Sequence, residues 1–182
     1  MKSNGAKAAG VELNGSAPAF APSVPLPPWS LTGSAILFLH GWRSLLMLVH
    51  YETSPVGPYN ELAVSALRTS GPAVIEMYVT SRAAMIGGRR GWGFPKQMAQ
   101  FRWHGRGRRV VFEAGRRRWR VRLCGPTVPV KARLCCVQIL AGQKVRVPLR
   151  VAGRAQLAFQ GRRLALLLDP LELTVLPPIF IT

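Results

Sequence analysis

Polar and apolar residues alternate along many short segments of this chain, which is the pattern of β-strands that bury one face. The segment 117–123 shows it most clearly, because Arg118, Arg120 and Arg122 alternate there with apolar residues. Further strands are predicted over residues 35–39, 45–51, 61–67, 73–80, 108–113, 133–140, 145–151, 155–160, 162–168, 171–176 and 179–181. The pattern therefore predicts a mostly β protein with minor helix, arranged as an antiparallel barrel or sandwich.

Turn signals and one helix separate the predicted strands. The segment 52–60 has the proline and glycine density of a loop, and Ala114-Gly115-Arg116 indicates a hairpin between its flanking strands. Residues 81–86 are predicted to form a short helix that Ser81 caps and the pair Gly87-Gly88 ends.

The beginning of the sequence differs in composition from the rest. Residues 1–24 are rich in Gly, Ala, Ser, Asn and Pro, so we expect a disordered leader. Residues 25–182 are expected to form a single domain with one core. No apolar run reaches the roughly 18 residues of a membrane span, and residues 1–15 lack the apolar centre of a signal peptide. We therefore expect a cytoplasmic protein without a membrane partner.

The chain is strongly basic, with a formal net charge of +18 from 25 Lys and Arg against 7 Asp and Glu. Phosphate, acidic lipid or an acidic substrate could bind such a chain. However, 20 of the basic residues are arginine, which a GC-rich genome would also produce, and no recognisable nucleic-acid module accompanies them. A solvated outer face is the favoured interpretation of Arg118, Arg120 and Arg122, and nucleic-acid binding is the least favoured function.

Lys96 is the strongest candidate for a catalytic residue. It directly follows Phe94 and Pro95, and it lies close in sequence to Trp92 and Met98. An ammonium group is costly to bury among apolar groups, so such a lysine tends to lose its proton. A neutral amine attacks carbonyl carbon, which the permanently protonated guanidinium of arginine cannot do. The alternative is a surface lysine, the more common role of this residue type.

Glu61 is the second candidate, at the start of the predicted strand 61–67. A carboxylate beside an imine-forming lysine can transfer protons or orient the substrate. The alternatives are an exposed acid at a loop end and, for the neighbouring Tyr59, a packing role. The three cysteines and three histidines show no metal-ligand spacing, so we expect small buried thiols, no metal and no cofactor.

Two ordered motifs carry a family resemblance. The stretch Tyr51-Glu52-Thr53-Ser54-Pro55-Val56-Gly57-Pro58-Tyr59-Asn60-Glu61-Leu62 is followed by Gly88-Arg89 and then by Gly93-Phe94-Pro95-Lys96. Together with Pro27-Pro28-Trp29 these segments resemble the acetoacetate decarboxylase family, over about residues 25–180. The resemblance implies a closed antiparallel β-barrel or cone with the lysine inside, assembled as a homo-oligomer.

The same resemblance implies roles for individual residues. Lys96 matches the lysine that forms a Schiff base with a β-keto acid, and Glu61 matches the family's loop-end glutamate. The small-molecule substrate, a keto acid or related carbonyl compound, is expected in a pocket formed by Tyr59, Met77, Phe94, Pro95 and Gln97.

Three positions depart from the family pattern. The decarboxylases carry a second lysine directly after the reactive one, where this chain has Gln97. The arginine that meets the substrate carboxylate falls at Ser34, and a second pocket glutamate falls at Leu46. These changes remove charged groups and put decarboxylation itself in question.

Three functional hypotheses follow. The first is an acetoacetate decarboxylase-like lyase that uses Lys96 as a Schiff-base lysine. The second is a relative with a changed pocket that performs other imine chemistry or only binds a ligand, for example in carotenoid-related metabolism. The third is an arginine-rich protein that binds nucleic acid through the face from Arg116 to Arg122.

Overall fold

A computed structural model describes residues 24–39, 43–106 and 109–181. The predicted disordered leader lies, but for its last residue, outside the described residues. The predicted organisation of residues 25–182 as a single domain stays a proposal.

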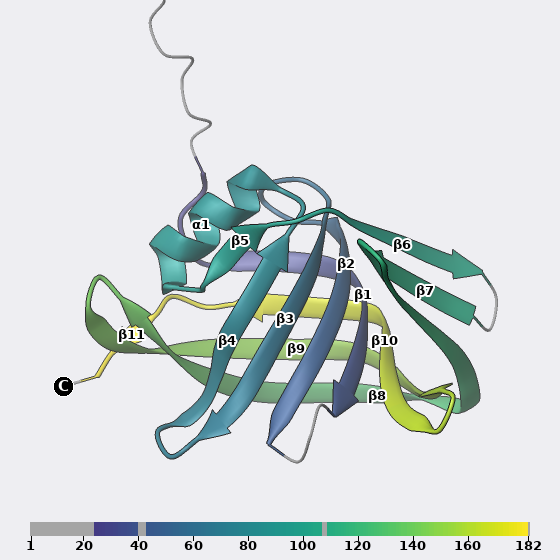
Figure 1. The fold of residues 1–182 in the computed structure, drawn as a ribbon. Helices are drawn as coiled ribbons and strands as arrows, with labels where there is room; N and C mark the ends of the chain where they lie inside the picture. Colours follow the sequence, from purple (N-terminus) through teal and green to yellow (C-terminus); the bar gives the residue numbers. More distant parts are fainter. Residues whose placement is uncertain (1–23, 40–42, 107–108, 182) are drawn as a thin grey trace, which may run out of the picture.

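In the described residues, a single sheet of 11 strands dominates the fold, and one helix accompanies it (Figure 1). The elements in chain order are β1 (Trp29–Leu39), β2 (Ser44–Thr53), β3 (Tyr59–Arg68), β4 (Gly71–Val79), α1 (Arg82–Trp92), β5 (Lys96–Met98), β6 (Phe101–Arg106), β7 (Arg109–Ala114), β8 (Arg117–Leu140), β9 (Gln143–Gln160), β10 (Arg163–Val175) and β11 (Ile179–Phe180). The strand order is β5-β4-β3-β2-β1-β10-β9-β8-β7-β6, and β11 pairs with β9. The mostly β composition with minor helix is confirmed.

The expected closure of the sheet into a barrel or cone is wrong. The hydrogen-bonded path ends on β5 at one side and β6 at the other, so the sheet stays open. The sheet curls until β4 contacts β8, but there a side chain bridges the two strands: the Gln138 amide donates to the Val74 carbonyl oxygen over 3.3 Å. The short parallel strand β5 occupies the edge of β4 only at Met77–Val79.

The pleat divides the apolar side chains between two clusters, one on each face of the sheet. The inner face carries the larger cluster, which includes Trp29, Ala35, Val49, Met77 and Leu171. The outer face carries Ile36, Phe38 and Leu48, against which the hairpin β6–β7 and the start of β8 pack through Phe112 and Val121. Successive residues of β1 and β2 thus pack on opposite faces of the sheet, and both faces are apolar there.

Helix α1 begins as predicted but ends later. Ser81 caps it, because its side chain accepts a hydrogen bond from the Ala84 amide over 3.2 Å. The predicted end at Gly87-Gly88 is wrong, since the helix continues to Trp92 and ends at Gly93, whose φ of 71° is left-handed. The two glycines instead let neighbouring side chains pack closely against the helix, since a Cβ at Gly87 would lie 2.4 Å from the Trp29 ring.

Several predicted strands are parts of longer ones. The segments 117–123 and 133–140 both lie in β8, and β9 and β10 each join two predicted strands across a bulge or a glycine. The strand β6 was not predicted at all. The exposed arginines at 118, 120 and 122 form the cationic face that the alternation predicted. Nucleic-acid binding by that face stays a prediction.

Candidate active site

Lys96 is the first residue of β5, a strand of three residues that runs parallel to β4. Its backbone is fixed on both sides: its amide donates to the Phe94 carbonyl over 2.8 Å, and its carbonyl oxygen accepts from Arg89 Nε over 2.6 Å. Its cross-strand neighbour is Met77, which faces the inner cluster. The Lys96 side chain points the same way and is only 4% exposed.

Glu61 meets this lysine inside the sheet. The residue belongs to β3, two strands away from β5, and it is 5% exposed. Its Oε2 atom lies 2.8 Å from Lys96 Nζ, which makes a hydrogen-bonded ion pair between two buried groups. Because removing either partner would leave an uncompensated buried charge, each side chain depends on the other.

Two tyrosines complete the polar part of the site. The Tyr51 hydroxyl donates to Glu61 Oε1 over 3.3 Å, and Lys96 Nζ donates to the Tyr59 hydroxyl oxygen over 3.5 Å. The two rings lie 4.8 Å apart between centroids, and Lys96 Nζ is 5.2 Å from the centre of the Tyr59 ring. Burial, and then the nearby Glu61 carboxylate, raises the pKa of both phenols well above the usual value, so both remain protonated donors.

The remaining wall is apolar. In register from Lys96, the sheet places Met77, Ala63 and Met47 in one cross-strand row on the inner face. On the helix side, Gly88 contacts the lysine stem: a Cβ there would lie 2.5 Å from Lys96 Cδ. The amine is therefore held by Glu61 and Tyr59 at its tip and by close packing along its stem.

The other residues of the predicted pocket differ in how deeply they are buried. Phe94 is buried against Trp92, with ring centroids 6.1 Å apart, and Pro95 is half-buried between it and the strand. Gln97 is exposed, and strand alternation directs it to the face opposite Lys96. Of the predicted set, the structure brings Lys96, Glu61 and Tyr59 into contact at the amine, and Met77 and Phe94 belong to the same buried cluster as Tyr59.

Ser34 and Leu46, the other two positions where the sequence departs from the family, have partners other than Lys96. The Ser34 hydroxyl donates to Asp169 Oδ1 over 3.0 Å. Leu46 packs in the outer cluster, on the other side of the sheet. Tyr51 is the site residue that sequence analysis did not assign to the pocket. It pairs with Tyr59 across the β2–β3 hairpin, so the symmetric spacing of the two tyrosines about the intervening loop was the available signal.

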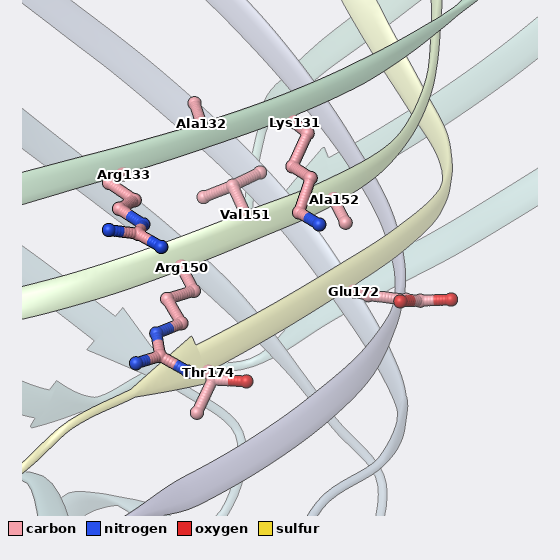
Figure 2. A pocket seen from close by; sticks show the side chains of 8 residues that line it. All are labelled: Lys131, Ala132, Arg133, Arg150, Val151, Ala152, Glu172 and Thr174. Carbon is pink, nitrogen blue, oxygen red and sulfur yellow. The ribbon is translucent and has the colours of Figure 1, made fainter.

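Side chains of the described residues also line hollows away from the amine, and Lys96 lines neither of the two considered next. One, of about 360 Å³, lies over β8, β9 and β10 and is lined by Lys131, Arg133, Arg150 and Glu172, among others (Figure 2). The other, of about 1040 Å³, lies on the outer face of β2–β4. Within the described ranges, no three His, Cys, Asp or Glu side chains are grouped so that they could hold a metal ion.

Comparisons with known proteins bear on the middle of the chain and on its fold. Residues 43–128 match the family described as "Acetoacetate decarboxylase (ADC)". No curated protein matches the chain by sequence. In the described residues, α1 is far too short to cross a membrane.

Solved structures share the fold at low sequence identity. The acetoacetate decarboxylase from Legionella pneumophila subsp. pneumophila str. Philadelphia 1 is similar with a TM-score of 0.55 and 13% identity, over 100% of this chain and 98% of that chain. The enduracididine biosynthesis enzyme MppR, solved in complex with pyruvate, has a TM-score of 0.55 and 10% identity, over 97% and 99% of the two chains. A further acetoacetate decarboxylase structure has a TM-score of 0.54 and 11% identity, over 91% and 94%.

The matched segment 43–128 contains Tyr51, Tyr59, Glu61 and Lys96, the four polar side chains of the site. The fold of the whole chain is that of the similar acetoacetate decarboxylases. The segment that builds the buried lysine site thus matches the acetoacetate decarboxylase family, and the chain shares the fold of solved acetoacetate decarboxylases.

Proposed function

We propose that this protein forms an imine between Lys96 and a small carbonyl substrate. The observation that supports the proposal most strongly is the 2.8 Å contact between Lys96 Nζ and Glu61 Oε2, with both side chains buried. A lysine used only for solubility would be exposed, and a lysine used only for packing would not need a carboxylate and a phenol at its tip. The family match over 43–128 adds to this support.

The ion pair supplies the proton transfers that imine formation requires. The Lys96 ammonium gives a proton to Glu61, and the neutral amine adds to the carbonyl carbon of the substrate. Glu61 then returns the proton to the departing oxygen, so that water leaves and a protonated imine remains. The Tyr59 hydroxyl, 3.5 Å from Nζ, is a donor that can hold the substrate oxygen during addition.

Decarboxylation of a β-keto acid is the first reaction that this imine could support. The bond between the α-carbon and the carboxylate breaks, its electron pair moves into the iminium, and carbon dioxide leaves. Glu61, which gave up its proton when water left, takes up a proton from solvent and passes it to the α-carbon of the enamine. Water then hydrolyses the resulting imine to release the ketone and Lys96.

One observation favours a second candidate, imine chemistry without loss of carbon dioxide. Among the buried side chains of the described residues, Lys96 is the only cation, and Glu61 already balances it. A substrate carboxylate in this site would face the Glu61 carboxylate without a second positive charge. An uncharged ketone or aldehyde would avoid that repulsion, so dehydration or aldol chemistry fits the charge balance better.

Borohydride reduction in the presence of a carbonyl compound tests the proposal directly. With acetone or acetoacetate, reduction should attach the substrate carbon skeleton to the peptide that contains Lys96, as peptide mass mapping would reveal. Lys96→Arg should abolish the attachment, while Lys144→Arg, a change at an exposed lysine of β9, should leave it intact. Equal attachment to the Lys96→Arg protein would refute imine formation at this residue.

A second assay separates the two candidate reactions. Release of carbon dioxide from acetoacetate, lost in Lys96→Arg, would establish the lyase. Efficient trapping without any release across a panel of β-keto acids would establish the second candidate.

A further inference from the structure

The groove of about 1040 Å³ on the outer face lies on the opposite side of the sheet from Lys96. Its floor comes from β2 and β3 through Leu46, Leu62 and Val64, and its walls include Phe101 and Trp119 of the β6–β8 region. All five of these side chains are only half-buried. A sizeable apolar surface therefore remains in contact with water in the free chain, which is a feature of binding sites.

The charges around this groove are unequal. Arg117, Arg118 and Arg163 line it, against the single acid Glu76. Arg118 is paired with Glu113, since its Nε lies 2.7 Å from Oε1. In the described part of the chain, Arg117 and Arg163 form no ion pair, and both are exposed. Two guanidinium groups are thus available to a ligand, and a guanidinium binds a carboxylate through two parallel hydrogen bonds.

The acidic residue and one of the arginines also lie on opposite sides of the apolar floor. Glu76 belongs to β4, whereas Arg163 begins β10, and the apolar floor of β2 and β3 lies between these two strands in the sheet. A ligand that lies across the floor can place an anionic end near the arginines and keep that end away from Glu76. A ligand with a cationic end would meet the excess of arginine instead.

We propose that this groove binds an amphipathic carboxylate, with its hydrocarbon body on Leu46, Leu62 and Val64 and its carboxylate on Arg117 and Arg163. The inference does not depend on imine chemistry at Lys96. In β3, Leu62 and Val64 alternate with Glu61 and Ala63, so substitutions on the floor of the groove leave the inner-face side chains in place.

A fluorescence titration with 11-(dansylamino)undecanoic acid tests the proposal, followed by competition with decanoate, decanol and decylamine. Decanoate should displace the probe at a concentration at least tenfold lower than decanol, and decylamine should be the weakest competitor. Equal competition by the three compounds, or better competition by decylamine, would overturn the assignment of the arginines.

Variants locate the bound probe. The double variant Arg117→Glu with Arg163→Glu should weaken probe binding at least tenfold, and Val64→Trp should weaken it by filling the floor. A matched control, Arg146→Glu with Arg154→Glu, makes the same change in net charge at exposed positions of β9 that do not line the groove. Equal weakening by the control, or unchanged binding in Val64→Trp with native circular dichroism, would overturn the proposal. Lys96→Arg should bind the probe like the parent, which separates this site from the imine site.

Discussion

The methylene stem of Lys96 in β5 occupies the space that any side chain at Gly88 in α1 would need. A Cβ at position 88 would lie 2.5 Å from Lys96 Cδ and 2.6 Å from Cε, closer than carbon atoms approach without bonding. The glycine is therefore a positioning residue for the lysine, although it lies inside a helix, where glycine lowers stability by about 1 kcal/mol relative to alanine.

Gly88→Ala should consequently separate the activity of the site from the stability of the fold. The lysine stem is flexible and can move aside, so the free energy of unfolding should change by less than about 1 kcal/mol. The amine should leave its place beside Glu61, and imine trapping should slow by about tenfold or more, since small misplacements of reacting groups are costly. Trapping rates and urea unfolding measure the two effects.

Gly91→Ala provides the control for this prediction, because it adds the same methyl group to the same helix. Its nearest neighbour would be Pro27 Cγ at 3.3 Å, and no atom of Lys96 is among its close contacts. Trapping at the parental rate in both variants would mean that Gly88 has no positioning role.

The buried pair of Lys96 and Glu61 should show strong energetic coupling. Glu61→Gln and Lys96→Met each leave a buried charge without its counter-charge, so each should lower the free energy of unfolding by about 3 kcal/mol or more. The double variant removes both charges and should lose less than the sum, by about 1–3 kcal/mol. Urea unfolding of the four proteins gives this coupling energy.

An exposed pair offers a comparison for the same measurement. Arg118 and Glu113 are joined by a 2.7 Å contact, but the Arg118 side chain is 49% exposed. Its double-mutant cycle should give a coupling of about 0.2–1 kcal/mol because solvent screens the charges. If the coupling energy of Lys96 and Glu61 were no larger than that of Arg118 and Glu113, the buried residues would not form an ion pair in solution.

The strands were predictable from the sequence wherever one face is buried and the other is solvated. The alternation in 117–123 gave the correct faces, and Ser81 was correctly predicted as a helix cap. The end of α1 was not predictable, because glycine usually ends a helix. Here Gly87 and Gly88 are required by Trp29 and Lys96, and those contacts exist only in the folded chain.

The candidate site was predictable only in part, for similar reasons. The family resemblance pointed to Lys96 and Glu61, but the distance between them depends on how β3, β4 and β5 align. Tyr51 needed the register of the β2–β3 hairpin. Gln97 was expected in the pocket because the resembling family carries a second lysine at that position, yet neighbours on a strand face opposite sides. Likewise, Cys124 and Cys135 are exposed, and only Cys136 is the buried thiol that the sequence predicted.

The Cys136 thiol should resist chemical modification while the chain is folded. Burial, more than any other effect, raises its pKa from 9.0 to about 11, so almost no thiolate forms at neutral pH. A thiol-specific disulfide reagent at pH of about 8 should modify Cys124 and Cys135 quickly, and Cys136 only after unfolding in urea. The Cys136→Ala variant should lose the thiol that reacts only after unfolding and keep the two thiols that react quickly. Quick reaction of all three thiols in the folded parent would contradict the burial of Cys136.

The two site phenols should make the fold sensitive to alkaline pH. The pKa of Tyr51 and that of Tyr59 lie well above the ordinary value of 10.0 in the folded chain, chiefly through burial and then through Glu61. The unfolded chain therefore releases these protons first as pH rises, so the free energy of unfolding should be fully retained below pH of about 10 and should fall above it. Urea unfolding between pH of about 8 and 11 measures the fall.

Variants assign that alkaline loss to the site. Tyr51→Phe or Tyr59→Phe removes one titrating phenol, so each should reduce the slope of unfolding free energy against pH above about 10, even if its stability at neutral pH is lower. Tyr78→Phe makes the same substitution on the outer face of β4 and keeps both site phenols. A parental slope in both site variants, together with early appearance of tyrosinate absorbance in the folded parent, would show that these hydroxyls are open to water. In that case Lys96 and Glu61 would no longer be enclosed by the two rings.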